Sequence, residues 1–242
     1  YAFEEQRGKT RILREPVGVV GAISPFNFPL NLVAHKLAPA IAAGCPVVLK
    51  PASSTPLSAL LLARTLAEAG LPDGFLSVVI GGGGSVGNAL VDHADVPMIS
   101  FTGSPPVGWG IRQRQPRKHV ALELGNSTPV IVEPDADLET AARKLAGSGF
   151  THAGQSCISV QRVYVHEAAY DRFRDLFVAA VEALVVGDPM DDATDVGPVI
   201  DAENRDRDLK NSHGVGYCNI TKCCTKVCPE SITITDNAII PL

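Results

Sequence analysis

The sequence has few features that would suit a membrane, a nucleic acid or an extracellular framework. None of its 242 residues lies in a run of about 18 apolar residues, so no membrane span is predicted. The net charge of −5 disfavours nucleic acid as a partner. Methionine is absent before Met98 and no signal peptide opens the chain, so we interpret it as an internal fragment of a cytoplasmic protein.

Cysteine is scarce through most of the chain and crowded near its end. Only Cys45 and Cys157 precede residue 205, whereas the other four are Cys218, Cys223, Cys224 and Cys228. This distribution does not predict a disulfide framework. It indicates two different chemistries within one polypeptide.

Short apolar runs alternate with helical segments between residues 16 and 125. Strands are expected at Val17–Ile23, Val47–Lys50, Leu76–Ile80, Met98–Thr102 and His119–Leu124. Helices are expected at Asn31–Ala43, Pro56–Ala69, Ser85–Asp92 and Ser104–Arg114, with Gly44 and Gly70 suited to end the first two. This alternation predicts an α/β fold with a doubly wound, mostly parallel, Rossmann-like sheet over residues 16–125.

A partial second α/β domain is expected over residues 126–204. Strands are expected at Pro129–Val132 and Val160–Val165, with a helix at Asp137–Ser148 and a helical apolar stripe over residues 169–184. Residues 1–15 precede the first domain. Beyond a junction near residues 204–208 the composition changes, so residues 205–242 are treated as a separate Cys-rich tail.

Two loops follow strands and are candidates for binding phosphate. Gly82–Gly87 matches G-x-G-x-x-G, but the acidic residue expected about 20 positions later is missing, which leaves phosphate binding or a tight turn open. In the loop that begins at Phe101, Gly103 lets the backbone approach an anion. Ser104 is expected to cap the following helix and reach the same anion.

Three side chains are candidates for catalysis, each with a structural alternative. Cys157 lies in a Gly/Ser-rich loop that suits a nucleophile, although lone cysteines are often buried core residues. Asn27 lies between two prolines that would hold its amide for an oxyanion, or it is an ordinary turn residue. Glu123 ends an apolar strand, where burial would make it a general base, or it is a salt-bridged structural carboxylate.

Five motifs, in this order, resemble the aldehyde dehydrogenase superfamily over about residues 10–204. They are Pro25–Pro29 (PFNFP), Val48–Pro51 (VLKP), Phe101–Gly108 (FTGSPPVG), Leu122–Gly125 (LELG) and Gly154–Cys157 (GQSC). The resemblance implies NAD(P)-dependent oxidation of a small-molecule aldehyde to a carboxylic acid. It implies that Cys157 attacks the aldehyde, that Asn27 stabilises the oxyanion, and that Glu123 activates the hydrolytic water.

The resemblance also implies a cofactor site and a homo-oligomer. By it, residues 1–15 are the remnant of an oligomerisation segment, residues 16–125 a dinucleotide-binding domain and residues 126–204 a partial catalytic domain. Lys50 would bind the adenosine ribose, and Gly103 and Ser104 would face the pyrophosphate. Phe101 and Gly125 belong to the same motifs and are assigned to this site. Ser53 stands where the family often has an acidic residue that would repel a 2′-phosphate, so NADP is expected to be tolerated as well as NAD.

The sequence departs from the family's pattern in two further places. Asn126 stands where glycine commonly follows LELG. No later EIFGP-like motif, which grips the nicotinamide ribose, is found in residues 205–242, and most of the oligomerisation element is missing. We therefore expect little activity from this chain alone.

The tail resembles the C-terminal part of the iron–sulfur subunit of succinate dehydrogenase or fumarate reductase. By that resemblance Cys218 and Cys224 would bind a three-iron cluster and Cys228 a four-iron cluster. The partner C-x2-C-x2-C-x3-C run is absent, so no cluster is expected to be completed by this chain.

Three alternative functions remain open at this point. An electron-transfer protein with its function in the tail predicts a visible chromophore. A non-catalytic chimeric fragment predicts a folded core without cofactor binding. A Cys–His hydrolase that uses Cys157 predicts ester cleavage independent of Glu123.

Overall fold

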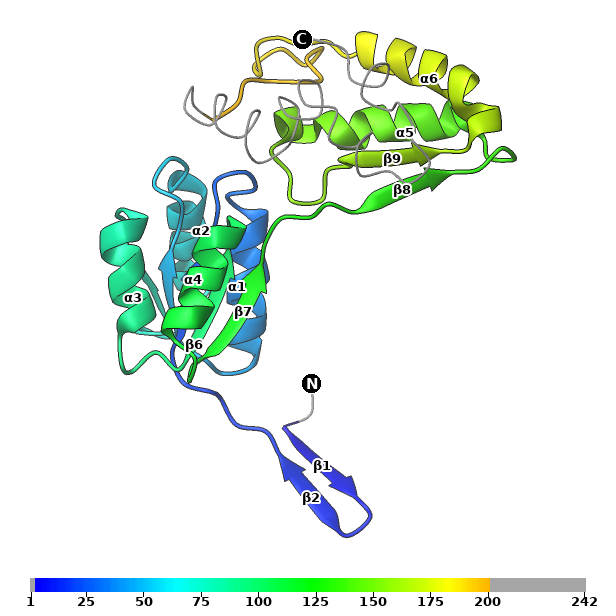
Figure 1. Cartoon of the computed structure of the whole chain (residues 1–242). Helices are drawn as coiled ribbons and strands as arrows, with labels where there is room; N and C mark the ends of the chain where they lie inside the picture. Colours follow the sequence, from blue (N-terminus) through cyan, green and yellow to red (C-terminus); the bar gives the residue numbers. More distant parts are fainter. Residues whose placement is uncertain (1–2, 201–242) are drawn as a thin grey trace. The chain divides into compact units, whose positions relative to one another are not determined.

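The computed structural model describes residues 3–200, which fall into two compact units (Figure 1). The first unit runs to Gly125 and the second begins at Asn126. This division coincides with the boundary expected from the sequence. Residues 201–242, which include the junction near 204–208 and the proposed metal ligands Cys218, Cys224 and Cys228, lie outside the described residues.

The first unit is built on a parallel sheet of five strands in the order β5-β4-β3-β6-β7. Its strands are β3 (Val20–Ile23), β4 (Val47–Lys50), β5 (Leu76–Val78), β6 (Met98–Thr102) and β7 (His119–Glu123). The chain crosses from the β5 edge to the other side of β3 to form β6. The sheet therefore reverses its direction of growth between β3 and β6, as the doubly wound prediction requires.

Helices cover both faces of this sheet (Figure 1). They are α1 (Asn31–Ala42), α2 (Leu57–Glu68), α3 (Asn88–Asp92) and α4 (Pro105–Arg114). Side chains of α1 and α2 share one core cluster with Ala22 and Leu49, whereas α3 and α4 share another with Ile99 and Phe101. Two covered faces explain why these short strands are apolar almost throughout.

The glycine-rich segment differs from the helix expected at Ser85–Asp92. Gly83–Gly87 forms a π-helical turn, and α3 begins only at Asn88. A side chain at Gly81 would collide with Val86, since a Cβ built there lies 2.3 Å from Val86 Cγ2. This close packing holds the turn against the end of β5, which ends at Val78 rather than at Ile80.

A hairpin at the start of the chain was not expected from the sequence. Strands β1 (Glu4–Arg7) and β2 (Thr10–Leu13) pair antiparallel, with Arg7 opposite Thr10. Gly8 has φ +59°, a value that suits glycine at the first central position of a two-residue hairpin loop. The polar, charged sequence of these strands hid the signal, because neither face is buried in a core.

The second unit contains a parallel pair of strands packed against two helices. Strands β8 (Pro129–Val132) and β9 (Arg162–Val165) pair in register, with α5 (Leu138–Phe150) between them in the chain and α6 (Glu167–Glu182) after them. Its core cluster joins β8, α5 and α6. Asp137 caps α5 by accepting the Thr140 N–H at 3.1 Å, and this hydrogen bond lowers the pKa of Asp137.

None of the helices between residues 3 and 200 has the length and apolar composition needed to cross a membrane.

Candidate functional site

A pocket of about 310 Å³ opens in the first unit beside the ends of β3, β4 and β6. It is lined by Ile23, Lys50, Gly83, Gly84, Gly87, Asn88, Val91, Phe101, Val107 and Ile111. Ile23 and Lys50 are the last residues of β3 and β4, and β3 lies next to β6. Open parallel sheets bind ligands at the carboxyl ends of strands where the topology switches direction, and this pocket lies there.

Lys50 brings a positive charge to this pocket. Only 4% of the residue is exposed, and its ammonium donates to the Pro51 carbonyl at 3.1 Å. Burial lowers the pKa of Lys50, since a low-dielectric surrounding disfavours the charged form. A cation held in this way is suited to bind ligand oxygens.

The glycine-rich turn forms one wall of the pocket through Gly83, Gly84 and Gly87. At Gly83 and Gly84 a Cβ would meet no atom within 4 Å. The backbone at these glycines is therefore open. An open backbone suits both interpretations of the G-x-G-x-x-G segment, phosphate binding and a tight turn. The position of the glycines in the pocket wall favours contact with a ligand.

The loop after β6 shows why glycine is required at position 103. A Cβ there would lie 2.6 Å from Cζ of Phe101, whose buried ring lines the pocket. The Gly103 N–H donates to the Glu123 carbonyl at 3.1 Å, which joins this loop to the end of β7. Ser104 stands at the N-cap of α4 as expected, but its hydroxyl makes no capping hydrogen bond, so that part of the prediction is wrong.

Four assigned cofactor residues lie outside the set that lines this pocket: Ser53, Gly103, Ser104 and Gly125. Ser53 is exposed, and its hydroxyl donates to the Gly81 carbonyl at 2.9 Å, which links the loop after β4 to the glycine-rich turn. Gly125 follows β7 at the end of the first unit. Their assignment rests on the motifs alone.

Lys36, on α1, is a buried cation that sequence reasoning missed. Only 6% of it is exposed, and its ammonium donates to Thr102 Oγ1 at 2.7 Å and to Ser100 Oγ at 3.2 Å. Burial lowers its pKa to about 8, and the charge of Glu123 opposes that shift. The sequence carried two signals of this site. Lys36 stands next to Leu37 on the apolar stripe of a helix, and the hydroxyl residues Ser100 and Thr102 are two positions apart along β6.

Asn27 and Glu123 belong to the first unit. Asn27 lies in the turn between β3 and α1, where its Oδ1 accepts the Phe28 N–H at 3.2 Å. Glu123 is the last residue of β7, and its side chain is exposed. The expectation that Glu123 is buried is therefore wrong: β7 is the edge strand of the sheet and alternates exposed with half-buried residues.

Cys157 belongs to the second unit, in the loop between α5 and β9. It is a half-buried free thiol, whereas Cys45 is buried in the core beneath α1. The Cys157 loop begins with the turn Thr151–Gly154, in which His152 and Ala153 have φ of 51° and 55°. Left-handed backbone at two consecutive non-glycine residues is uncommon and clusters at functional sites.

Asn126 contacts this loop from the start of the second unit. Its side-chain amide donates to the Cys157 carbonyl and its Oδ1 accepts the Thr128 N–H at 2.8 Å.

Within the described part of the chain, no group of three or more His, Cys, Asp or Glu side chains could hold a metal ion.

Comparison with known proteins places most of the chain in one family. The model of the aldehyde dehydrogenase family matches residues 2–213. A 3-sulfolactaldehyde dehydrogenase of Priestia aryabhattai is 52% identical over 195 residues, which cover 81% of this chain and 41% of that protein. The NADP(+) succinate-semialdehyde dehydrogenase of Escherichia coli is 44% identical over 192 residues, covering 78% and 40%.

Solved structures agree with this result. A mutant of aldehyde dehydrogenase C from Pseudomonas syringae, complexed with NAD+ and octanal, superposes with a TM-score of 0.84 at 40% identity, covering 89% of this chain and 45% of that one. A glyceraldehyde-3-phosphate dehydrogenase of Methanocaldococcus jannaschii, complexed with NADP, has a TM-score of 0.78 at 47% identity, covering 81% and 44%.

None of these comparisons bears on the iron–sulfur resemblance of the tail. The chain spans about two fifths of the length of the curated relatives it matches. The five motifs, the pocket at the switch point of the sheet and the family match agree, and on this evidence the chain belongs to the aldehyde dehydrogenase family.

Proposed function

We propose that this chain serves NAD(P)-dependent oxidation of an aldehyde to a carboxylic acid. The observation that carries the proposal is the pocket beside the ends of β3, β4 and β6, in a chain whose structural relatives are complexed with NAD+ or NADP. One of those complexes also contains octanal, an aldehyde. Since the chain spans about two fifths of its relatives, binding and chemistry are tested separately.

The Lys50 ammonium in the pocket would bind ribose hydroxyls, and Gly103 and Ser104, just before α4, would face the pyrophosphate. The Gly103 N–H is bonded to the Glu123 carbonyl and α4 begins with two prolines, so the Ser104 N–H would be the donor to this anion. The collision of any Cβ at Gly103 with Phe101 explains why the backbone is bare at this point. When bound, the nicotinamide supplies a hydride acceptor.

In the proposed chemistry the Cys157 thiol releases its proton to solvent, and the thiolate adds to the aldehyde carbon to form a thiohemiacetal oxyanion. The Asn27 amide and the Cys157 N–H would stabilise that charge. Loss of hydride converts the thiohemiacetal to a thioester. Glu123 would then take a proton from the water that attacks the thioester, which releases the carboxylic acid and restores the thiol.

Titration with NAD and NADP tests the cofactor assignment. NADP is expected to bind within about tenfold of NAD, a difference of about 1.4 kcal/mol. Ser53→Glu should weaken NADP binding selectively, because a carboxylate repels a 2′-phosphate, whereas the neighbouring exposed Ser54→Glu should change the ratio much less. If neither NAD nor NADP bound to the chain, the proposal would be overturned.

Labelling with an aldehyde-mimicking electrophile, followed by peptide mass mapping, tests Cys157. The half-buried Cys157 is expected to react well before the buried Cys45, and Cys157→Ser should abolish both this labelling and any aldehyde oxidation. Labelling that spares Cys157 while the tail cysteines are masked would rule it out as the nucleophile.

We also propose a cytoplasmic homo-oligomer, as the family resemblance implies. The two-stranded sheet of β1 and β2 has no further strand at either edge among the described residues, and Leu13 is 57% exposed. Unpaired strand edges favour association with another chain. Light scattering across a concentration series tests this, and a monomer at all concentrations would contradict it.

A further inference from the structure

We propose that Asn126 is a positioning residue that fixes the backbone of the nucleophile loop. The inference rests on the proposed function, since it takes Cys157 as the nucleophile. The observation is that the Asn126 side-chain amide donates to the backbone carbonyl of Cys157, although the two residues are 31 positions apart. Both residues belong to the second unit, so the contact is internal to one compact body.

The nucleophile loop, residues 151–159, satisfies several of its polar groups by itself. The Gln155 N–H and its side-chain amide each donate to the His152 carbonyl at 3.0 Å. The Ser159 N–H and hydroxyl donate to the Ser156 carbonyl at 3.1 Å and 2.9 Å, and the Ile158 N–H reaches Ser156 Oγ at 3.4 Å. The Cys157 carbonyl differs, because its donor comes from Asn126, outside the loop.

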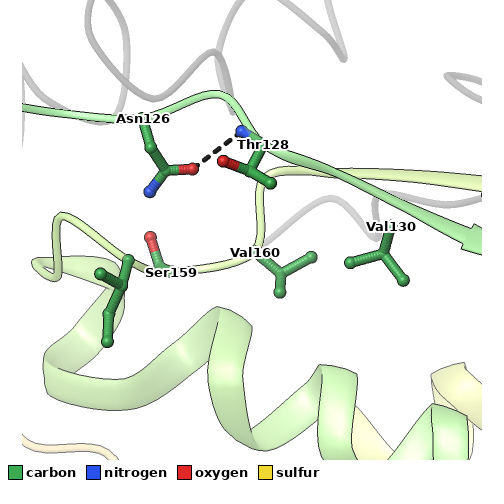
Figure 2. Close-up of a pocket in the computed structure, with 6 residues that line it drawn as sticks. Asn126, Thr128, Val130, Ser159 and Val160 are labelled. Carbon is green, nitrogen blue, oxygen red and sulfur yellow. Dashed lines mark hydrogen bonds between the residues drawn. The ribbon is translucent and has the colours of Figure 1, made fainter.

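The Asn126 amide is itself held at its other end. Its Oδ1 accepts the Thr128 N–H at 2.8 Å, just before β8 begins at Pro129 (Figure 2). In the same view the amide nitrogen points toward the loop that carries Ser159. An amide bonded at both ends has little rotational freedom, so Asn126 joins the start of β8 to the nucleophile loop.

This bridge stands beside a gap in the packing. A pocket of about 280 Å³ is lined by Asn126, Thr128, Val130, Ile158, Ser159 and Val160 (Figure 2). Packing therefore does not fill the space between the start of β8 and the loop. Ile158, next to the nucleophile, is 80% exposed, whereas Ser156 and Ser159 on either side are buried. The Asn126 hydrogen bond therefore adds a restraint to the exposed part of the loop.

The restraint acts where a nucleophile needs it. Holding the Cys157 carbonyl holds the Cys157–Ile158 peptide plane, which limits rotation about the Cα–C bond of Cys157 and so restrains the position of its Cα and side chain. Nucleophilic catalysis depends on such alignment, because small misplacements cost large factors in rate. The glycine that the family resemblance expects at this position has no side chain and cannot make this bond, so the tether is a feature of this chain.

The first test measures hydrogen–deuterium exchange across residues 151–159 of the full chain. Asn126→Gly removes the tether and should accelerate exchange of the Ile158 and Ser159 amides by about 3- to 10-fold, as expected for loss of one hydrogen bond. Ser127→Ala is the matched control, since Ser127 is exposed and engages Arg162 only through its backbone carbonyl. Equal exchange in both variants would overturn the tether.

The second test uses a readout that a merely structural role would not move, the pH profile of Cys157 alkylation by iodoacetamide. Asn126→Asp keeps the acceptor for Thr128 but places a negative charge against the residue that carries the thiol, so the half-maximal pH should rise by about one unit. Ser127→Asp adds the same charge one residue away and should shift the profile far less. Identical profiles for these two variants would contradict the proposal.

These readouts need neither cofactor nor turnover. Failure of the wild-type chain to bind NAD or NADP would overturn the proposed function and leave the tether measurable. A wild-type chain that binds cofactor, but whose loop exchange and alkylation are insensitive to Asn126, would overturn the tether alone.

Discussion

A buried lysine inside the first unit shows how one residue can link stability to the chemistry of the site. Among residues 3–200, the acceptors in contact with the Lys36 ammonium are two hydroxyls, those of Ser100 and Thr102. Burying a charge without a contacting counter-ion is costly, and here that cost appears as a pKa lowered to about 8. Glu123, the proposed base, is close enough to Lys36 to oppose the shift electrostatically.

Lys36→Met is predicted to change how stability depends on pH. Below pH 8 the lysine is protonated in both states, and burying the charge costs about 3 kcal/mol, from 10.5 to about 8 at 1.36 kcal/mol per unit. Between pH 8 and 10.5 the unfolded chain binds the proton and the folded chain does not, so the wild type gains stability as pH rises.

The measurement is urea unfolding of both proteins at pH 7 and pH 9.5. From pH 7 to pH 9.5 the free energy of unfolding of the wild type should rise by about 2 kcal/mol relative to that of Lys36→Met. Using the difference between the two proteins cancels the other titrating groups. A constant difference across the range would show that Lys36 is not protonated differently in the two states.

At the scale of the element, two helices of the first unit end in the same hydrogen-bonded motif. After α1 the Gly44 N–H donates to Ile41 and the Cys45 N–H to Ala40; after α2 the Gly70 N–H donates to Ala67 and the Leu71 N–H to Leu66. The glycines have φ of +75° and +91°. These are Schellman caps, and they confirm the expectation that both glycines end helices.

Gly70→Ala and Gly110→Ala are predicted to have opposite effects on stability. Both glycines are exposed, and a Cβ at either would meet no atom within 4 Å, so only backbone conformation differs. Alanine at Gly70 is forced into the left-handed region, which costs about 1–2 kcal/mol. Alanine inside α4 at Gly110 should stabilise by about 0.5–1 kcal/mol. Chemical denaturation of the two variants and the wild type measures this, and shifts of the same sign would contradict it.

At the scale of the whole molecule, each unit has its own hydrophobic core. The two clusters of the first unit contain no residue beyond Leu124, and the cluster of the second unit contains none before Val130. The proposed cofactor pocket is lined by residues of the first unit alone. The proposed nucleophile and its tether belong to the second.

Calorimetry is predicted to resolve two unfolding transitions, of which NADP raises only one. A ligand that binds the folded state stabilises by about 2.7 kcal/mol at 100 times its Kd, and here it should act on the first unit. Peptides from residues 16–125 should gain protection from hydrogen exchange in the same titration. A single cooperative transition that moves as a whole would contradict independent cores.

Much of the fold and part of the site could be predicted from local pattern. β4, β6 and β8 were predicted with their observed bounds, since short apolar runs bounded by glycine or proline are signals that neighbouring residues carry. Lys50 and Phe101 were assigned to the cofactor site by motif, and both line the pocket. The hairpin of β1 and β2 was missed because its strands bury no face.

Short motifs were enough to predict the family, the alternation of strands and helices, and the residue types at the proposed site, because each of these is carried by neighbouring residues. The exposure of Glu123 on an edge strand, the burial of Lys36 among hydroxyls and the bond from Asn126 to the Cys157 carbonyl became visible only in the folded chain. Burial and hydrogen bonding of this kind depend on residues tens of positions apart, and their pairing is set by the order of strands and the packing of helices.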